Sequence, residues 1–488
     1  MVLRIAIVGS GISGLAAFWA LRLTEHDVHL YERSDCLGGC EQVFSWSDEE
    51  EKALIDPTLT LYNPTSHPNL AAWLSYLQIP TIPVHYTFGV ENESTGFGWS
   101  STSLWRLFSR NIFLMCRMLY DIWRFHLTTV DLTNPFHPRW FDSIGVFLRR
   151  EKYSHIFCDN YLIPLIASTW IQDPRCILSM PTGAVVSYLR RHRFQPFFAR
   201  SFLWRSVEGG AKRYIEAIFD NTDDCQVHRA TRVHRILHEG SRLRLQVENG
   251  PTSDFDHVIL ATGPANALQV LDATNEERKV LEKFRTTTHT VFLHSDVKFL
   301  PPTREIWAFR NYRIHRSYSD ALSELYSGST TTYINYVQNE KGGDTKPLLL
   351  TTDPEVPPQE SEVQCTFMYD GPVYDKDSIV AQREMKYIQG SRNIWFTSSS
   401  LAHGLSEDGF CQGIEVARII CPELTVSLPF KFRGRHEKGG NEINAPRGRH
   451  FGSIWQSVLH YMLVCYSWWH KLYRIWSRIS DGERMWKR

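Results

Sequence analysis

The sequence LRIAIVGSGISG at residues 3–14 decides the fold. Its apolar run at 3–8 ends in glycine and predicts a buried parallel strand, and residues 12–23 predict a helix directly after the turn. The sequence DVHLYER at 27–33 predicts a second strand, which completes a strand–helix–strand unit. The spacing Gly-x-Gly-x-x-Gly between a strand and a helix indicates a dinucleotide-binding fold.

Each glycine of this turn has its own role in holding a pyrophosphate. Gly9 allows the tight turn, Gly11 lets the backbone approach the phosphates, and Gly14 lets the helix pack against the strand. The helix N-terminus adds free N–H groups and a positive dipole end. Glu32 ends the second strand, where a carboxylate accepts hydrogen bonds from ribose hydroxyls and disfavours the 2′-phosphate of NADP. These residues do not distinguish between FAD and NAD as the bound dinucleotide.

The composition is that of an ordinary folded chain of 488 residues, 43% hydrophobic and 22% charged, long enough for about two to four domains. Fifty-three basic residues balance 53 acidic ones, which argues against a nucleic-acid binder that relies on a basic surface. The ten cysteines include no CxxC pair, and Cys36 and Cys40 have no second pair to complete a zinc site. We therefore expect no metal site and a cytoplasmic protein with reduced thiols.

Further elements are predicted along the chain. Residues 104–125 predict a helix whose apolar surface exceeds one stripe, so it could line a channel, lie in a membrane interface or pack on two sides. Residues 339–362 are rich in Lys, Gly, Pro and Glu and predict a long loop or insertion. The other predictions are β-structure at 227–263 with a turn at Asn249–Gly250, a strand at 393–399, a turn leading into a helix at 407–420 and a polar linker at 431–450.

The stretch 451–479 is aromatic and helical in pattern. Its apolar core ends at Lys471 and Arg474 after roughly 16 residues, short of the ~20 that a bilayer requires. Clustered Trp and Tyr with flanking Arg are typical of a helix in the headgroup layer, although a helix docked on the protein would have the same composition. We expect peripheral contact with an intracellular membrane through 451–479.

Gly9 to Gly14, Glu32 and the following Gly38–Gly39 resemble the start of the flavin-containing amine oxidoreductase superfamily. The nearest resemblance is to an amine-oxidase-like, FAD/NAD(P)-binding branch, some of whose members are associated with modified fatty-acid metabolism. Five later blocks in the same order extend the resemblance over most of residues 1–420, at 55–77, 161–170, 204–215, 258–264 and 404–417. The resemblance favours FAD over NAD.

The resemblance implies an α/β fold: a Rossmann-like FAD-binding domain of the glutathione-reductase/amine-oxidase type with an α+β substrate domain. The discontinuous FAD-binding domain would comprise residues 1–75, 204–270 and 385–425, and the substrate domain 76–203 and 271–384. A linker at 426–450 would lead to an aromatic amphipathic tail at 451–488.

The resemblance also implies which residues hold FAD. Gly9, Ser10, Gly11, Ile12, Ser13 and Gly14 would hold the pyrophosphate, Glu32 and Arg33 the adenosine ribose, and Val233 the adenine. Gly38 and Gly39 would form a turn beside the phosphates and the ring, Gly263 the turn after another strand, and Asp408 and Gly409 the surroundings of the ribityl chain and pyrimidine edge. Cys36 and Ser398–Ser399 depart from the superfamily, which commonly has an Arg and an acidic residue there, and 56–60 lacks the branch's Gly-Phe.

No catalytic residue is evident from the sequence. His403 could act as an acid or base or be hydrogen-bonded in a loop, and Tyr62 and Asn63 could orient a substrate or satisfy buried backbone. Cys40 could attach the cofactor or be a plain turn residue. No GxSxG, GxxxxGK[ST] or HExxH motif supports a hydrolase or kinase.

The resulting hypothesis is an FAD-dependent oxidoreductase that oxidises or desaturates a hydrophobic small molecule such as a lipid, terpenoid or other secondary metabolite. Hydride would pass to flavin N5, and molecular oxygen would accept the electrons because no second nucleotide-binding loop is visible. Three alternatives stay open: a flavin-dependent isomerase or mutase without net oxidation, a membrane-associated FAD-binding protein without catalysis, and an NAD-dependent dehydrogenase.

Overall fold

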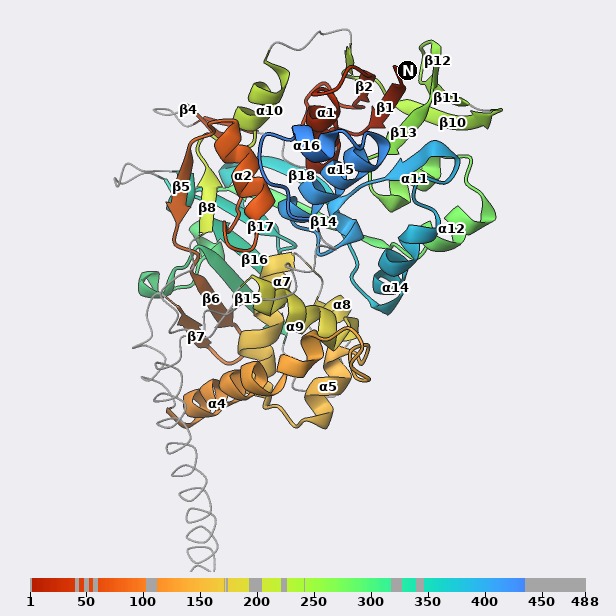
Figure 1. Cartoon of the computed structure of the whole chain (residues 1–488). Coiled ribbons are helices and arrows are strands. Elements are labelled where there is room, and N and C mark those ends of the chain that lie inside the picture. Colours follow the sequence, from red (N-terminus) through yellow and green to blue (C-terminus); the bar gives the residue numbers. More distant parts are fainter. Residues whose placement is uncertain are drawn as a thin grey trace, which may run out of the picture. The chain divides into compact units, whose positions relative to one another are not determined.

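The structure is a computed structural model, shown in Figure 1. It describes residues 2–39, 44–47, 52–55, 60–101, 112–170, 172, 174–192, 204–220, 226–240, 242–316, 327–338 and 346–434. By internal contacts the chain divides into Met1–Arg435 and His436–Arg488, and the fold described below belongs to the first unit. Cys40, residues 435–450 of the predicted linker and the whole predicted tail lie outside the described residues.

A parallel sheet forms around the first strand, in the order β19-β13-β1-β2-β9. Ile5, Ala6 and Ile7 of the central strand are fully buried because both faces of the sheet are covered. The strands predicted at 3–8, 27–33 and 393–399 are confirmed. The bounds are β1 Arg4–Val8, β2 Asp27–Tyr31, β9 Val227–His228, β13 His257–Leu260 and β19 Ile394–Phe396.

One face of this sheet is covered by α1 (Ile12–Leu21) and α15 (Ser406–Ile420), with α2 (Pro68–Tyr76) and α10 (Lys212–Phe219) beside them. All ten residues of α1 are buried, and the helix predicted at 12–23 is confirmed. The helix predicted within 407–420 is also confirmed, but it already begins at Ser406, so the turn predicted at its start is wrong. A Cβ at Gly413 would lie 2.2 Å from the carbonyl oxygen of Ser13, so the two helices pack this closely only with glycine there.

The opposite face carries an antiparallel meander and three helices. The meander bears out the predicted β-structure, and Asn249 at its predicted turn has φ +57°. Its strands are β10 Val233–Glu239, β11 Arg242–Val247 and β12 Thr252–Phe255, and the helices are α11 Pro264–Val270, α12 Asn275–Leu281 and α14 Lys376–Glu384.

A second, mixed sheet has the order β18-β14-β17-β16-β15-β6-β7, with only β15 and β6 parallel among its described pairs. β17 (Leu349–Thr352) lies inside 339–362, so the loop prediction is wrong for these residues. The strand is only four residues long, and the polar residues on either side of it gave no sequence signal for a strand. The other bounds are β6 Phe88–Asn92, β7 Phe97–Ser100, β14 Thr286–His294, β15 Arg310–Arg316, β16 Ser327–Tyr333 and β18 Val363–Pro372.

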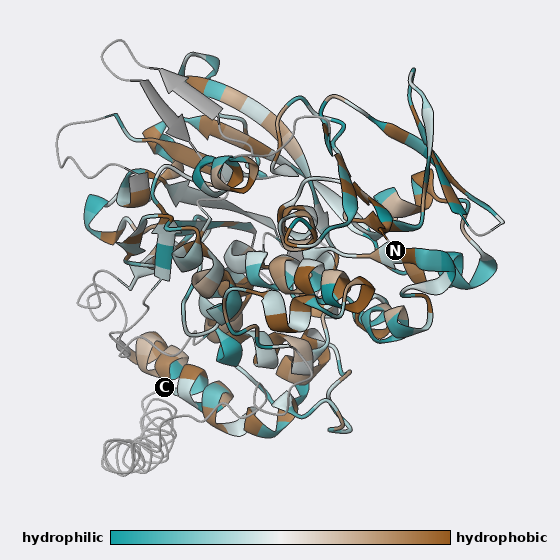
Figure 2. Ribbon diagram, turned by 45° about the horizontal axis from the view of Figure 1, so that its top comes forward, coloured by the Kyte–Doolittle hydropathy of each residue, from teal (hydrophilic) through white to brown (hydrophobic). Residues whose placement is uncertain are grey.

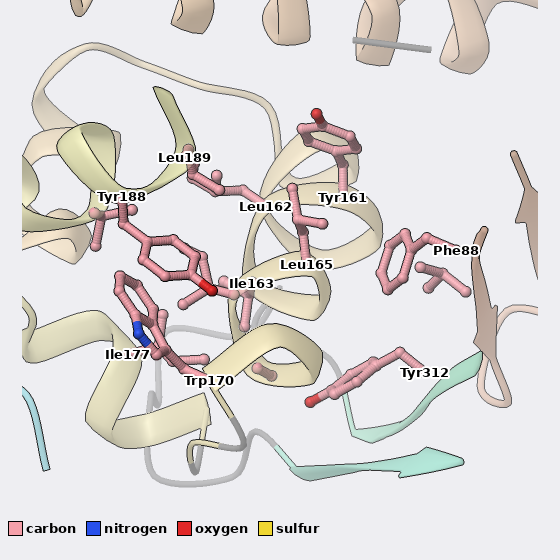
Figure 3. Close-up of a cluster of buried hydrophobic side chains, with 14 of the residues drawn as sticks. Phe88, Tyr161, Leu162, Ile163, Leu165, Trp170, Ile177, Tyr188, Leu189 and Tyr312 are labelled. Carbon is pink, nitrogen blue, oxygen red and sulfur yellow. The ribbon is translucent and has the colours of Figure 1, made fainter. Parts of the chain in front are cut away.

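Helices pack on this second sheet through an aromatic and aliphatic core (Figure 3). Their bounds are α4 Ile112–Thr128, α5 Ile144–Arg150, α6 His155–Phe157, α7 Ile163–Trp170, α8 Pro174–Ser179 and α9 Thr182–Arg191. The predicted helix at 104–125 is described from Ile112. It buries Met115, Met118, Ile122 and Phe125 and exposes Phe113 and Leu114, so its described part packs on one side and the two-sided alternative is wrong there.

Short elements complete the described chain: the strand pairs β3 Phe44–Ser47 with β4 Lys52–Ile55 and β5 Thr81–Val84 with β8 Trp204–Val207, and the helices α13 Asn335–Gln338 and α16 Leu424–Ser427. After α16 the chain stays packed, because Phe432 is buried and the Arg433 N–H donates to Asn69 Oδ1 at 2.8 Å. Hydrophobic residues concentrate in the interior elements, whereas the outer turns are largely hydrophilic (Figure 2).

Candidate functional site

The glycine turn between β1 and α1 combines close packing with one open position. Gly9 has φ +103° and donates its N–H to the carbonyl of Tyr31 at 2.8 Å. A Cβ at Gly14 would lie 2.0 Å from the Gly9 carbonyl oxygen, whereas a Cβ at Gly11 would meet no atom within 4 Å. Gly11 therefore borders open space at the N-terminus of α1, where a pyrophosphate could approach the backbone.

Glu32 is the buried carboxylate of this turn. Its Oε2 accepts hydrogen bonds from the N–H and Oγ of Ser10 at 2.9 and 2.7 Å, and its Oε1 accepts from the Ser34 N–H at 3.0 Å. The Gly38 N–H donates to Ser10 Oγ at 3.1 Å, so the Gly38–Gly39 turn is tied to the glycine turn. Oε1 accepts this one hydrogen bond from the protein, so it can accept another from a ribose hydroxyl.

A polar hollow of about 400 Å³ lies beyond Glu32. Its lining residues are Arg33, Ala230, Arg232, Glu248 and Asn249. The Thr231 N–H donates to the Glu32 carbonyl at 2.7 Å, which places the hollow next to Glu32. The structure thus brings together Arg33 and Arg232, the residue before Val233, at the position expected for adenosine.

The carboxyl ends of β13 and β19 complete the candidate nucleotide-binding site. Gly263 has φ +82°, and a Cβ at Gly409 would lie 2.7 Å from Cγ2 of Ile12, so the start of α15 touches the glycine turn. The buried Oγ1 atoms of Thr262 and Thr397 have no hydrogen-bond partner in the described part of the chain. Buried polar atoms of this kind are normally satisfied, so they fit a polar ligand lying across the strand ends.

Asp408 is buried and closes the turn before α15. Its Oδ2 accepts from the backbone N–H groups of His403 and Leu405 at 3.1 and 3.3 Å. His403 Nδ1 lies 3.9 Å from the same oxygen, and the His403 carbonyl accepts from Trp170 Nε1 at 2.7 Å. His403 therefore connects α15 of the nucleotide-binding sheet to α7 of the helical layer.

Two buried histidines that the sequence did not single out lie beside this turn. The rings of His67 and His192 are 5.1 Å apart and both are at most 2% exposed. His67 Nδ1 accepts from the Asn63 N–H at 3.2 Å, so the ring proton is on Nε2, which has no partner among the residues that the structure describes. Burial lowers the pKa of His67 to about 4, against the opposing charge of Asp408, and lowers the pKa of His192 well below its usual value.

Aromatic rings join these histidines into what we call the histidine–aromatic cluster: His67, His192, His403, Trp170, Tyr188 and Trp204. Ring centroids are 3.8 Å apart for Trp170 and Tyr188, 4.7 Å for Tyr188 and His192, 6.2 Å for Tyr188 and His403, and 5.8 Å for His67 and Trp204. Trp170 and Tyr188 lie side by side (Figure 3). Burial raises the pKa of Tyr188 well above its usual value, so its phenol stays protonated.

Tyr62 and Asn63 lie at the entry to α2. Tyr62 is buried in the core around α1, and its backbone pairs with Arg205 at 2.8 and 2.9 Å. Asn63 Oδ1 accepts from the Thr65 N–H at 3.0 Å, and its carbonyl accepts from the His67 N–H at 2.7 Å. Both residues thereby shape the turn that places the His67 ring.

Glu407, next to Asp408, is a further buried carboxylate, and the sequence did not single it out. Its Oε1 accepts from Asn69 Nδ2 at 2.9 Å and its Oε2 from the Leu70 N–H at 2.7 Å, at the N-terminus of α2. Burial raises its pKa, and these hydrogen bonds oppose the rise. Glu407 fixes the helix that directly follows His67.

The model of the NAD(P)-binding Rossmann-like domain matches residues 7–77, and that of the flavin containing amine oxidoreductases matches residues 160–355. A search of curated proteins gives no match.

Several solved structures share the fold. Cyclohexylamine oxidase from Brevibacterium oxydans IH-35A has a TM-score of 0.62 at 14% identity, over 87% of this chain and 100% of that one. The CLA-producing fatty acid isomerase from P. acnes has a TM-score of 0.60 at 15% identity, over 85% and 98%. Reduced UDP-galactopyranose mutase has a TM-score of 0.60 at 15% identity, over 87% and 97%.

The α/β fold, the Rossmann-like domain and the family expected from the sequence are thus confirmed. The chain is a flavin-dependent oxidoreductase enzyme that is similar to the flavin-containing amine oxidoreductases over residues 160–355.

Proposed function

We propose that the protein is an FAD-dependent oxidoreductase that oxidises or desaturates a hydrophobic small molecule. The observation that carries the proposal is the histidine–aromatic cluster beside Asp408, at the carboxyl ends of the nucleotide-binding strands. Ligands of open α/β sheets bind at this edge. A bound flavin supplies hydride acceptance at N5, and the protein supplies orientation and exclusion of water.

The residues around the glycine turn support FAD as the bound flavin. Glu32 Oε1 would accept from the adenosine ribose, Arg33 and the backbone at Val233 would border the adenine, and the N–H groups at the start of α1 would hold the pyrophosphate. The first turn of α1 contains no acidic side chain that would repel phosphate.

The cluster itself offers neutral groups at pH 7. His67 Nε2–H can donate a hydrogen bond to an acceptor on the ligand, and Tyr188 keeps its phenol proton. Such groups orient a substrate without adding charge, while the rings of Trp170, Tyr188 and Trp204 exclude water from its apolar part. An aromatic lining of this kind favours a hydrophobic substrate.

A flavin-dependent isomerase or mutase is the second candidate. Two of the structures that share the fold are named as a fatty acid isomerase and a UDP-galactopyranose mutase. In such a reaction the substrate would be rearranged with no net consumption of an oxidant.

The test starts from the purified protein and its visible spectrum, followed by denaturation and identification of the released cofactor. A panel of lipids, terpenoids and amines is then added anaerobically. We expect one class to bleach the flavin absorbance and, in air, to release hydrogen peroxide. Product formation without bleaching or peroxide would establish the isomerase instead. A colourless protein that binds no FAD, or a yellow one that no compound reduces or converts, would contradict the proposal.

We further propose that residues 451–479 contact a membrane surface, on the sequence argument of clustered Trp and Tyr with flanking Arg. Within the described residues, no helix combines the length and apolarity needed to span a bilayer. Removing 451–488 should move the protein from the membrane pellet to the supernatant, measured by fractionation with full-length protein as control. An unchanged distribution would exclude this contact.

A further inference from the structure

Arg310, at the start of β15, keeps an intermediate accessible surface, although protein atoms enclose its guanidinium. Across the second sheet it lies opposite Thr332 of β16 and Phe88 of β6. Its NH1 donates to Thr332 Oγ1 at 2.7 Å, and its guanidinium carbon lies 5.5 Å from the centroid of the Phe309 ring. Burial lowers its pKa, and the main opposing interactions are with Tyr86 and Tyr188.

Among the residues that the structure describes, no carboxylate forms an ion pair with Arg310. The Nε of Arg310 is buried and has no hydrogen-bond acceptor among these residues. Arg313, three residues along the same strand, shows the usual arrangement: it pairs with Glu91 at 3.2 Å and with Glu93 at 3.5 Å. Desolvating a cation without a counter-charge is unfavourable, so buried charges are normally paired. An unbalanced guanidinium in the interior therefore points to an anion supplied from outside the chain.

The surroundings of Arg310 connect it to the candidate site. Tyr86 hydrogen-bonds to Arg310 and to Thr169, and its ring lies 5.5 Å from that of Trp204 in the histidine–aromatic cluster. Tyr188 is within electrostatic range of both Arg310 and Asp408. Tyr86 likewise keeps an intermediate accessible surface.

We propose that Arg310 binds a carboxylate of the substrate, so that the substrate is an apolar molecule carrying a single carboxylate. The inference rests on the proposed function and narrows its substrate class. A planar guanidinium matches a carboxylate with two parallel N–H···O bonds, and one cation balances one negative charge, which disfavours a phosphate dianion. The same unbalanced cation repels a protonated amine, so amines are poor candidates despite the name of the superfamily.

The test compares matched ligands on the flavin-loaded protein: decanoate with methyl decanoate, and 4-phenylbutanoate with its methyl ester. Binding is followed by thermal shift and by perturbation of the flavin spectrum. We expect at least one acid to bind about 10- to 100-fold more tightly than its ester, as a charge-assisted hydrogen bond predicts. Arg310→Met should remove this preference, and Arg310→Lys should retain part of it.

The control variant is Arg304→Met, because Arg304 is exposed and its guanidinium lies over the ring of Trp307, outside the histidine–aromatic cluster. It should keep the full preference for the acid. Equal binding of acid and ester to the unmodified protein would overturn the proposal, even if Arg310→Met does not fold. So would a preference that persists in a folded Arg310→Met. A protein without flavin would overturn the proposed function, while the thermal-shift comparison of acid and ester would still decide the role of Arg310.

Discussion

Gly11→Val should abolish flavin binding and leave the fold intact, whereas Gly14→Val should abolish both. Gly11 has φ −62°, which any residue adopts, and its Cβ would meet no protein atom within 4 Å. The valine side chain would instead occupy the space that a pyrophosphate needs. At Gly14 the Cβ would lie 2.0 Å from the backbone oxygen of Gly9, which cannot move without separating α1 from β1.

The two variants are compared by flavin content and by thermal unfolding of the apoprotein. Gly11→Val should purify with at least about ten times less flavin but unfold at the same temperature as the wild-type apoprotein. Gly14→Val should be destabilised by more than about 4 kcal/mol, the range typical of severe backbone clashes, and should accumulate as insoluble protein.

Gly11→Ala is the graded control. Its single methyl group should leave the unfolding temperature of the apoprotein unchanged and should narrow the space for the pyrophosphate less than valine does. Normal FAD content in Gly11→Val would show that the cofactor does not lie along this turn. A soluble, stable Gly14→Val would contradict the packing of α1 on β1.

The nucleotide-binding half could be predicted from sequence because its signals are local. The strand before Gly9, the helix after Gly14 and the carboxylate at Glu32 all lie within one short unit, where spacing alone fixes their relative positions. Asp408 and Gly409, in contrast, are indicated by the family resemblance and not by local spacing, and both lie in the first turn of α15.

The histidine–aromatic cluster could not be predicted in this way. His67, His192 and Trp204 come from different elements, and only the packing of α2, α9 and β8 brings their rings together. Arg310 looks like any other strand arginine in sequence, because the lack of a nearby carboxylate is a property of the folded interior. The strand β17 escaped detection since four residues, LLTT, carry too little periodicity.

The second prediction with a large expected effect is a loss of stability in acid through His67. Its pKa is about 4 in the folded protein, where burial opposes the charge, and about 6.5 in an unfolded chain. Between these values the unfolded chain binds a proton that the folded chain excludes, so stability falls as the pH drops from about 6.5 to about 4 and is fully present above this range. The loss is about 3 kcal/mol for this group.

His67→Asn tests this effect, because the Asn side-chain oxygen can take the place of Nδ1 as acceptor for the Asn63 N–H. The free energy of unfolding of the apoprotein is measured from pH 7.5 to pH 4.5. The slope of the variant should be smaller than that of the wild type by up to about 1.4 kcal/mol per pH unit. His234→Asn, at an exposed position on β10, should retain the wild-type slope.

Protonation of His67 in the folded protein, near pH 4, should also disturb the candidate site. His67 carries its single proton on Nε2, so the second proton must go to Nδ1 and removes the acceptor of the Asn63 N–H. The turn that holds the ring then loses the hydrogen bond that fixes it, next to the strand ends where the flavin would lie. Flavin should therefore dissociate at a higher pH than that of global unfolding, and His67→Asn should bring the two transitions together. Equal acid slopes in wild type and His67→Asn, with flavin release unchanged, would mean that His67 is not a buried neutral donor of the site.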